Sequence, residues 1–474
     1  MKIGMVVEGS YPYVSGGVAS WVQTVMQRMP EHEFEVITIT PTPMTEEDYR
    51  YTLPNNVKGI TNLPLNLEQK NRKKSRKPIT EEEQRVLTEW MMLEEPNSAA
   101  LEVIRSRISN SKEFFSEQLF WHLVQNSYKK EKQSASFIEY FYMWKGMFTP
   151  VIELIQCEVP EVDLVHSVST GYAGLLAAVI KLQQRIPYIL TEHGIYSRER
   201  EEEILKASWI ADYYKQRWIH FFHHLTKQAY READDIITLF ERNSELQAQI
   251  GAPEEKLHVI PNGIDYKKLS EVKRQKTSKD KLIMGAIVRI VPIKDIKTMI
   301  HAAKLLDDRA IPFELYIMGP LDEDEEYTEE CSLLIQQLDL KGRVYLTGKV
   351  NISEYLPIFD VCLLTSISEG QPLAVLEGMA AGIPWVVTDV GACSELIYGG
   401  THDRFGPAGF VVTPVKPTQI AERCEWFYHN PSEAVKFGMN GKKRVEEYYQ
   451  VDQFIDLYAQ LYKERREEYG RDRF

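Results

Sequence analysis

The sequence predicts an α/β protein with two doubly wound, parallel-sheet domains, and three observations support this prediction. Short apolar runs alternate with helical periodicities along most of the 474 residues, which is typical of parallel strands covered by helices on both faces. A purely helical stretch interrupts this alternation at about residues 66–150, and a Lys-rich segment without periodicity follows at residues 267–281. We therefore expect a first domain over residues 1–276 and a second over residues 277–474. We leave open whether the last helix packs back on the first domain.

In the first domain, the apolar run Ile3–Val7 predicts a buried strand, followed by a Gly-rich turn and a helix over residues 18–29. Further short apolar runs predict strands at residues 34–40, 164–167, 187–191, 236–239 and 257–260. Apolar periodicity predicts helices at residues 173–184 and 205–232. The helical stretch at about residues 66–150 is rich in Phe and Trp and is interpreted as an insertion. Its basic run Lys70–Lys77 fits either a solvated loop or a contact with a membrane surface or an acidic partner.

The second domain repeats the pattern of the first without an insertion. Apolar runs predict strands at residues 282–288, 313–318, 344–346, 361–364 and 385–388. Helical patterns lie between them, beginning with residues 298–306. A doubly wound sheet binds its ligands outside the carboxyl ends of its strands, so residues that directly follow these strands are the candidates for function.

Composition excludes several classes of protein. With 56 Lys and Arg against 69 Asp and Glu, the formal net charge is −13, which argues against a nucleic-acid polymer as partner. The five cysteines form no C-x-x-C pair, so we expect reduced thiols in a cytoplasmic protein. The apolar run at the amino end is too short for a signal peptide, and no stretch approaches the roughly 18 apolar residues of a membrane span.

Two cations follow the first strand of the second domain. Arg289 and Lys294 lie between the strand at residues 282–288 and the next helix, a position at which phosphates bind. An Arg can hold a phosphate with two hydrogen bonds, and a Lys can add a point charge. The pair therefore predicts a diphosphate clamp, with ordinary surface cations as the alternative.

A loop with two carboxylates follows the strand at residues 361–364. It begins at Glu369, and Gly370 and Pro372 precede a predicted helix whose first N–H groups could bind an anion. Glu377 lies eight residues after the first carboxylate, on that helix. Carboxylates accept pairs of hydroxyl groups, as a sugar or a ribose presents them. Glu377 alone is also explained as an ordinary glutamate near a helix start.

Two further signals lie in the first domain. Gly16 and Gly17 follow the first strand and would let a ligand approach the backbone closely, although such a pair is also common in ordinary turns. His193 follows the strand at residues 187–191 and would lie at the ligand edge, although a lone histidine is more often structural.

No metal site is expected. His220, His223 and His224 have the spacing of one helical face, but their aromatic neighbours favour packing over metal binding. The acidic run Asp322–Glu326 is interpreted as a solvated loop and not as a metal-binding D-x-D motif.

Taken together, these residues resemble the GT4 family of retaining glycosyltransferases, which have the GT-B fold. The resemblance covers nearly the whole chain. It rests on the Gly16-Gly17 loop, the Arg289/Lys294 pair, the segment Val259–Asp265 and the E-x7-E pair Glu369/Glu377. The segments Val7–Val18 and Thr191–Arg200, with the insertion, are most similar to the PelF group of this family, the cytoplasmic glycosyltransferases of Pel exopolysaccharide systems.

The resemblance implies a role for each matching residue. Arg289 and Lys294 would neutralise the donor diphosphate, and Glu377 would bind the ribose hydroxyls. Glu369 would hold the donor sugar, and His193 would lie beside the bond that forms, so these two and the two cations are the implied catalytic residues. The other implied substrate-binding residues are Gly16, Gly17, Gly319, Gly370, Gln371, Pro372 and Leu373.

The implied reaction transfers a sugar from a UDP-sugar, expected to be UDP-glucose, to a growing exopolysaccharide with retention of configuration. No metal or other cofactor is implied, because Arg and Lys replace the metal. The implied partners are the polysaccharide acceptor and membrane-associated proteins of the synthase complex at the inner face of the cell membrane.

Three questions stay open at this stage. Glu369 could act as a nucleophile, although the family favours front-face attack of the acceptor. The chain could instead be a UDP-sugar epimerase on the same fold. It could also be a nucleotide-binding scaffold of the exopolysaccharide machinery.

Overall fold

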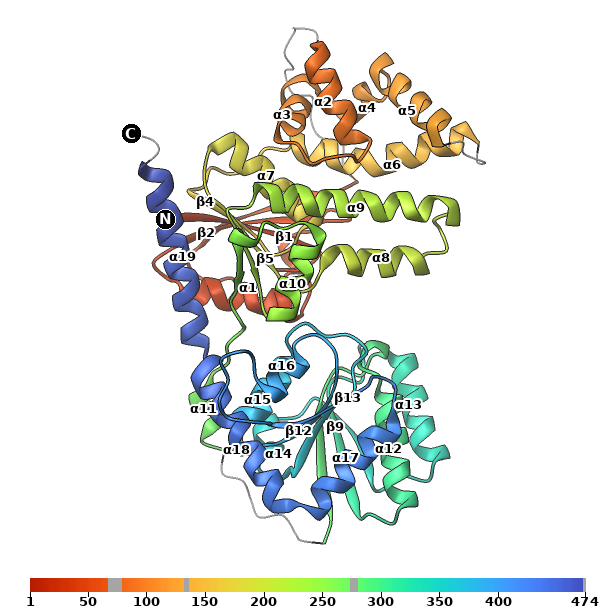
Figure 1. Cartoon of the computed structure of the whole chain (residues 1–474), viewed down its shortest axis with the longest axis vertical. Coiled ribbons are helices and arrows are strands. Elements are labelled where there is room, and N and C mark those ends of the chain that lie inside the picture. The colour runs from red at the N-terminus through yellow and green to blue at the C-terminus, as the bar shows by residue number, and fades with distance from the viewer. Residues whose placement is uncertain (67–78, 132–135, 273–279, 472–474) are drawn as a thin grey trace. The chain divides into compact units, whose positions relative to one another are not determined.

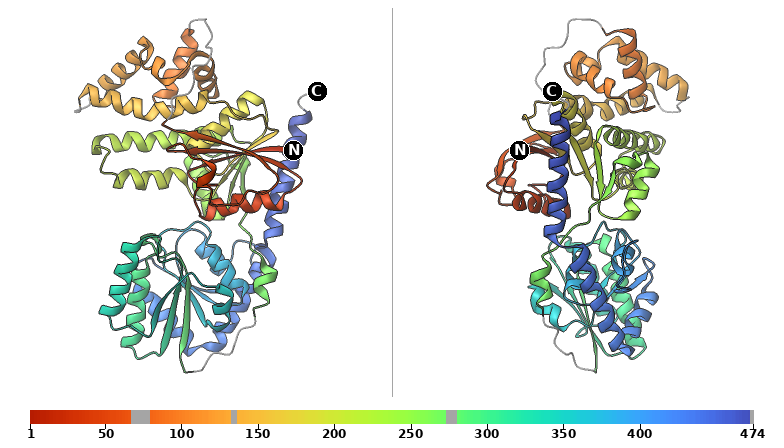
Figure 2. Two further views of the ribbon diagram at one scale, coloured as in Figure 1. Left: turned by 180° about the vertical axis from the view of Figure 1, so that it is seen from behind. Right: turned by 60° about the vertical axis from the view of Figure 1, so that its left-hand side comes forward.

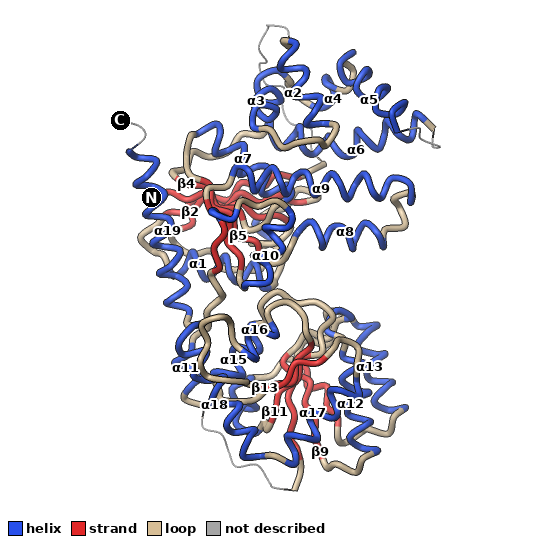
Figure 3. The backbone as a smooth tube through the Cα atoms, viewed as in Figure 1, coloured by secondary structure: helices blue, strands red, loops and turns tan. Residues whose placement is uncertain are grey.

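The computed structural model describes residues 1–66, 79–131, 136–272 and 280–471, and the basic run at residues 70–77 lies outside them. The chain divides into two compact units. Unit 1 comprises Met1–Thr238, Asn243–Val259 and Tyr458–Phe474, and unit 2 comprises Leu239–Arg242 and Ile260–Leu457. Each unit is built around one parallel sheet (Figures 1 and 3).

The sheet of unit 1 has the strand order β3-β2-β1-β4-β5-β6-β7, and all neighbouring strands are parallel. Its strands are β1 (Lys2–Glu8), β2 (Glu33–Thr40), β3 (Val57–Pro64), β4 (Leu164–Ser167), β5 (Tyr188–Glu192), β6 (Asp235–Thr238) and β7 (Leu257–Val259). Its helices are α1 (Gly17–Arg28), α7 (Gly171–Gln184), α8 (Tyr196–Lys206), α9 (Asp212–Glu232) and α10 (Glu241–Ile250). The chain reverses its winding between β1 and β4, so the switch point of this sheet lies there.

The sheet of unit 2 has the order β10-β9-β8-β11-β12-β13 and is also parallel throughout. Its strands are β8 (Leu282–Ile287), β9 (Phe313–Met318), β10 (Val344–Gly348), β11 (Val361–Leu364), β12 (Trp385–Thr388) and β13 (Gly409–Val412). Its helices are α11 (Tyr266–Ser270), α12 (Ile296–Asp308), α13 (Glu325–Gln337), α14 (Ile352–Tyr355), α15 (Leu373–Ala380), α16 (Cys393–Tyr398), α17 (Pro417–His429) and α18 (Pro431–Tyr448). The switch point lies between β8 and β11, and the prediction of two doubly wound domains is confirmed.

The predicted insertion forms a further helical layer in unit 1, between β3 and β4 in the chain. It consists of α2 (Glu81–Met91), α3 (Ser98–Arg107), α4 (Ser111–Phe114), α5 (Gln118–Glu131) and α6 (Phe137–Gln156). The layer packs on α7 and α9 (Figure 2) and shares one apolar core with the sheet. Buried Trp90 of α2 donates to Gln228 of α9 at 2.8 Å. The insertion extends beyond the expected residue 150, because α6 runs on through Pro150 and buries apolar residues after it.

One predicted helix is wrong. The sequence predicts a single helix over residues 205–232, whereas the structure forms a hairpin of α8 and α9, joined at residues 207–211. Helix α8 was missed because Tyr196, Ser197 and Ile204 are its only buried residues, which is too few for an apolar period. The hairpin projects from the sheet in unit 1 (Figures 1 and 2).

The last helix, α19 (Val451–Arg471), starts in unit 2 and passes into unit 1 at Tyr458. The hydroxyl of Tyr458 lies 2.9 Å from that of Thr191, and the hydroxyl of Tyr462 lies 2.6 Å from Nδ1 of His166. The boundary between units thus falls at Val259/Ile260, before the Lys-rich segment in which the sequence placed it. Residues Ile260–Leu457 belong to unit 2.

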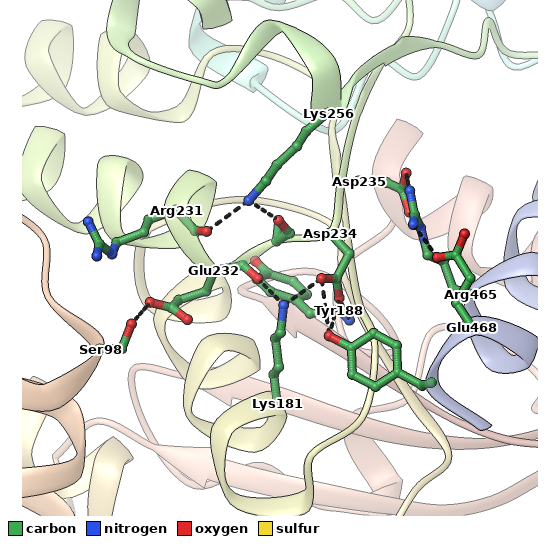
Figure 4. Close-up of polar contacts among 12 residues, drawn as sticks. Ser98, Lys181, Tyr188, Arg231, Glu232, Asp234, Asp235, Lys256, Arg465 and Glu468 are labelled. Atoms are coloured by element: carbon green, nitrogen blue, oxygen red, sulfur yellow. Dashed lines mark hydrogen bonds and ion pairs between the residues drawn. The ribbon is translucent and has the colours of Figure 1, made fainter. Parts of the chain in front are cut away.

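An ion pair with a buried carboxylate holds α19 against the sheet of unit 1 (Figure 4). Arg465 donates to both carboxylate oxygens of Asp235, at 2.5 and 2.7 Å, and His258 lies 3.0 Å from the same group. Burial would raise the pKa of Asp235, but the hydrogen bonds from His258 and Arg465 hold it below its ordinary value. The carboxylate therefore stays ionised although its side chain is fully buried.

Replacing Arg465 by alanine is expected to lower the free energy of unfolding by roughly 3 kcal/mol, because Asp235 would keep a buried charge without its bidentate partner. Chemical denaturation measures this change. Lys463→Ala is the matched control, because Lys463 is exposed on the same helix, and it should cost less than about 0.5 kcal/mol. Equal losses in both variants would contradict the role assigned to the ion pair.

Candidate active site

In unit 2, the segments that leave β8 and β11 are fastened to each other at the switch point. The hydroxyl of Thr365 donates to the carbonyl oxygens of Lys294 and Asp295, both at 3.0 Å. The amide of Ile367 donates to the carbonyl oxygen of Ile293 at 2.9 Å. Because these contacts hold the backbone from 293 to 295, Lys294 occupies a fixed place directly before α12.

Lys294 and Glu369 form an ion pair at this place. Their side chains are only 16% and 9% exposed, and the hydroxyl of Ser366 donates to the same carboxylate oxygen at 2.5 Å. A positive and a negative group therefore lie side by side at the carboxyl edge of the sheet, both poorly hydrated. The sequence predicted each residue for this edge but did not predict that they would pair.

Arg289 does not share a partner with Lys294. Its guanidinium pairs with Glu323, and both side chains are considerably more exposed than the Lys294–Glu369 pair. Glu323 belongs to the acidic run that the sequence assigned to a solvated loop. The two predicted cations are thus each balanced by a different carboxylate.

The loop from Glu369 to Leu373 is held from two sides. The amide of Ala392 donates to the carbonyl oxygen of Gly370 at 2.9 Å, and the amide of Asn262 donates to Oε1 of Gln371 at 2.6 Å. Gly391 has a φ of 53°, and a Cβ on it would lie 2.2 Å from the carbonyl oxygen of Gly370, so the turn that faces the loop requires glycine.

The same loop leads into α15 through Pro372, which caps the helix without a side-chain hydrogen bond. The first N–H groups of α15 therefore have no side-chain cap, and such groups bind anions. Glu377 lies on the second turn of α15. Burial raises the pKa of Glu377, and the charge of Lys268, which the sequence did not single out, partly opposes this rise.

Gly319 is explained by packing. It follows β9, and a Cβ on it would lie 1.8 Å from the carbonyl oxygen of Val288 at the end of β8. The close approach of two neighbouring strand ends thus requires glycine at this position whether or not a ligand binds there.

Gly16 and Gly17 differ from Gly319, because nothing in the described chain crowds them. A Cβ on either residue would meet no atom within 4 Å, and the φ of Gly16 is 176°, an extended value open to any residue. Both glycines are exposed at the start of α1. Neither packing nor backbone strain in the free protein therefore accounts for this pair.

His193 lies at the same end of unit 1, in the turn after β5. Trp21 of α1 packs edge-on against its ring, with 4.9 Å between the ring centroids. Burial lowers the pKa of His193 to about 4, so the ring is neutral at pH 7. Its Nε2 is buried and has no hydrogen-bond partner within the part of the chain that the structure describes. A neutral imidazole with one unused nitrogen can hydrogen-bond a ligand hydroxyl.

Sequence reasoning missed a cluster around Glu8, the last residue of β1. One of its carboxylate oxygens accepts from the amides of Tyr172 and Ala173 at the start of α7, at 3.2 and 3.4 Å. The other accepts from the hydroxyl of Tyr196 at 2.8 Å and from Arg200 at 3.4 Å. Burial raises the pKa of Glu8 against these contacts. The signal in the sequence that could have indicated Glu8 is its position directly after the apolar run Ile3–Val7.

The three histidines of α9 do not converge. His220 is exposed, His223 lies 3.8 Å from Glu201, and buried His224 packs edge-on against Trp90 at 5.1 Å. Across the described ranges, no group of three or more His, Cys, Asp or Glu side chains could hold a metal ion. None of the described helices is long and apolar enough to cross a membrane.

Comparison with known families gives two matches. Residues 1–255 match the family described as "Domain of unknown function (DUF3492)", and residues 268–444 match "Glycosyl transferases group 1". The MMP alpha-(1->4)-mannosyltransferase of Mycolicibacterium hassiacum is 27% identical over 293 residues, which are 60% of this chain and 66% of that protein.

Two further comparisons agree with these matches. An Escherichia coli UDP-Gal:alpha-D-GlcNAc-diphosphoundecaprenol alpha-1,3-galactosyltransferase is 25% identical over 260 residues, 52% of this chain and 62% of that one. The match thus spans less than two thirds of the length of either curated relative. The structure of Anabaena HepE in complex with UDP covers 98% of this chain and 100% of its own, with a TM-score of 0.60 and 16% identity. The predicted GT-B fold is confirmed.

The glycines give a first test of the site. Gly319→Ala is expected to cost about 2 kcal/mol of unfolding free energy, because the new methyl group would overlap the backbone of Val288. Gly17→Ala should change stability by less than about 0.5 kcal/mol, because its methyl group would enter open space. Chemical denaturation of both variants measures the difference, and similar losses would contradict the packing described.

The neutral state of His193 predicts a dependence of stability on pH. Because its folded pKa is about 4 and the ordinary value is 6.5, the unfolded chain binds the extra proton first. This residue should therefore destabilise the fold as pH falls from about 6.5 to 4. Thermal unfolding of wild type and His193→Asn across this range measures the effect.

The variant should lose less stability on acidification than the wild type, by up to about 3 kcal/mol at pH 4. The raised pKa values of Glu8 and of buried Glu192 stabilise the fold as pH falls, in wild type and variant alike. The test therefore compares the difference in stability between the two proteins at each pH. Parallel pH profiles would show that His193 is not held neutral by burial.

Proposed function

Because the chain belongs to the DUF3492 family and carries a group 1 glycosyltransferase domain on a GT-B fold, we propose that it is a retaining hexosyltransferase of the GT4 type. It moves a sugar from a UDP-sugar, with UDP-glucose as the expected donor, to a growing exopolysaccharide. The donor binds in unit 2 at the switch point between β8 and β11.

The observation that carries this proposal is the Lys294–Glu369 ion pair beside the uncapped start of α15. The ammonium group and the first N–H groups of the helix, which lack a side-chain cap, attract the same ligand, an anion. A diphosphate would compete with Glu369 for Lys294. The released carboxylate, which still accepts from Ser366, would then be available to the hydroxyl groups of the donor sugar.

The chemistry follows from where negative charge develops. As the bond between the anomeric carbon and the phosphate oxygen breaks, charge grows on the diphosphate, and Lys294 and Arg289 stabilise it. The acceptor hydroxyl forms the new bond on the same face, and its proton passes to the leaving phosphate oxygen. Each fixed donor contributes a few kcal/mol to such a step.

The contacts of Glu369 favour a holding role over a nucleophilic one. After the diphosphate takes over Lys294, Ser366 still donates to the carboxylate, and this hydrogen bond withdraws electron density from the oxygen that would attack. Glu377 is assigned to the ribose hydroxyls. His193 is assigned to a sugar hydroxyl through its unused Nε2, and Gly16 and Gly17 to the close approach of a substrate to the start of α1.

The identity of the substrates rests on similarity. HepE of Anabaena was solved with UDP and with UDP-glucose, and a curated relative is named for transfer from UDP-galactose. The resemblance of Val7–Val18 and Thr191–Arg200 to the PelF group supports the proposal that the product is the Pel polysaccharide of biofilms. On this proposal the enzyme works in the cytoplasm without a metal, and membrane-associated synthase proteins recruit it to the membrane.

Nucleotide protection tests the donor site. In buffer containing EDTA, UDP is expected to raise the thermal unfolding temperature of the wild type more than ADP or GDP does. Lys294→Ala should abolish this rise, because the diphosphate would lose its central cation. For each protein, the increase in unfolding temperature is measured relative to the same protein without UDP. This is necessary because Lys294→Ala also leaves Glu369 without its partner, which changes the unfolding temperature by itself.

Lys297→Ala is the matched control, because Lys297 lies on the adjacent turn and pairs with exposed Glu330. It should keep the full rise. Equal protection by ADP would contradict the assignment of UDP as the donor nucleotide. An unchanged increase in unfolding temperature in Lys294→Ala would contradict the assignment of the donor site. Turnover of UDP-N-acetylglucosamine without acceptor would indicate an epimerase instead, and tight nucleotide binding without transfer would indicate a scaffold.

A further inference from the structure

One side of unit 1, formed by α5, α6 and the α8–α9 hairpin, exposes large apolar side chains. These elements project from the same side of the sheet (Figures 1 and 2). We name this surface the aromatic face, and its apolar residues, between 40% and 77% exposed, are Trp121, Ile138, Tyr142, Leu205, Trp209 and Tyr213. At about 200 Å² for a whole aromatic side chain, its four rings alone expose on the order of 450 Å². An apolar patch of this size marks a surface that binds a partner.

The part of the aromatic face on α5 and α6 is continuous. The ring of Trp121 on α5 stacks on that of Phe141 on α6, with 5.1 Å between the ring centroids. The ring of Phe141 in turn contacts that of Tyr142 at 5.8 Å. Ile138 precedes Tyr142 by one helical turn, so both lie on one exposed strip of α6.

The tip of the hairpin adjoins this strip of α6. The hydroxyl of Tyr213 donates to Glu139 of α6 at 3.2 Å. The ring of Trp209 contacts that of Trp218 at 6.3 Å, and a Cβ on Gly146 of α6 would lie 3.7 Å from Trp218. Both contacts are made beside the exposed strip, so the aromatic face continues from α5 across α6 to the hairpin.

Lysines accompany the apolar side chains of the face. Lys129 lies two turns after Trp121 on the same side of α5, and Lys145 lies one turn after Tyr142 on α6. Lys130 is exposed beside Lys129. None of the three lysines forms an ion pair with a side chain in the described part of the chain.

The acidic side chains at the hairpin tip are already balanced. Glu202 pairs with Lys206 at 4.0 Å, and Asp212 pairs with Lys215 at 2.9 Å. Against the three lysines stands one further carboxylate, Glu139, so positive charge is in excess on the described part of the face. A second copy of the chain would bring the lysines together, because a two-fold interface pairs a surface with itself. Anionic lipid headgroups would neutralise them, and Trp and Tyr rings are enriched at the depth of such headgroups.

We propose that the aromatic face binds the anionic headgroup region of a phospholipid bilayer and holds unit 1 on the membrane surface. The apolar side chains enter the boundary between headgroups and acyl chains, and the lysines meet the lipid phosphates. This inference goes beyond recruitment by synthase proteins, because the lipid itself is the partner. It depends neither on the identity of the donor nor on the reaction.

Vesicle flotation with the full chain tests the proposal. The wild type should bind mixed vesicles of phosphatidylglycerol and phosphatidylcholine about ten-fold more tightly than vesicles of phosphatidylcholine alone. Trp209→Ala should weaken binding to the mixed vesicles about ten-fold, and Trp209→Tyr should restore part of the loss, because tyrosine also suits the interface. Replacing both Lys129 and Lys145 by glutamine should remove most of the preference for phosphatidylglycerol.

Two leucines provide a matched pair of variants. Leu205 on the aromatic face and Leu333 on α13 of unit 2 are 50% and 49% exposed. Leu205→Glu should weaken vesicle binding about ten-fold, because it places a negative charge against the lipid. Leu333→Glu should bind as the wild type does.

The proposal is overturned if the wild type does not bind the mixed vesicles, or if Trp209→Ala and Leu205→Glu bind them unchanged. It is also overturned if Leu333→Glu loses binding equally, or if the face variants lose self-association in sedimentation while their vesicle binding stays. Protection by UDP is measured on the same variants and should be unchanged. It shows that they are folded, and it lets the aromatic face fail while the donor site stands.

Discussion

The order of the strands in unit 2 is the constraint on which its site depends. Strands β8 and β11 are neighbours, but β8 connects to β9 and β11 connects to β12, in opposite directions along the sheet. The two segments that leave these strands therefore diverge from one another at the switch point. Thr365 bridges these two segments and fixes the backbone beneath Lys294. The ion pair, the loop that follows Glu369 and the start of α15 all occupy positions set by this one contact region.

The net charge of −13 describes the surface and not the candidate site. Three cations near the strand ends each form an ion pair with a carboxylate: Lys294 with Glu369, Arg289 with Glu323 and Arg200 with Glu8. Such pairing balances the charge of each cation in the free protein. On the proposed function, it would leave the carboxylate free for hydroxyl groups when an anion takes the cation over. An acidic protein can thus bind an anionic substrate through a few placed groups.

The sequence predicted β4, β9, β11 and β12 with the bounds that the structure gives them, because these strands are rich in buried apolar residues. It missed β3 and β13, which lie at sheet edges and bury few side chains, so their pattern carries little apolar signal. The positions of Lys294 and Glu369 at the carboxyl edge of the sheet could be predicted, because each residue follows a predicted strand. Their pairing, and that of Arg289 with Glu323, depends on how side chains from separate loops meet, which spacing along the chain does not encode.

The path of α19 has a consequence for how the protein is made. The segments that enter and leave unit 2 lie together, since the amide of Ile264 donates to the carbonyl oxygen of Tyr449 at 2.9 Å and Gly263 has no room for a Cβ beside Gln450. Unit 2 is therefore, in topological terms, a domain inserted with adjacent ends into unit 1. During translation its residues can collapse into a finished domain while His166 and Asp235 still await Tyr462 and Arg465. Completion of unit 1 by α19 thus follows synthesis of unit 2, and until then a nascent chain exposes one histidine and one carboxylate that are buried in the folded protein.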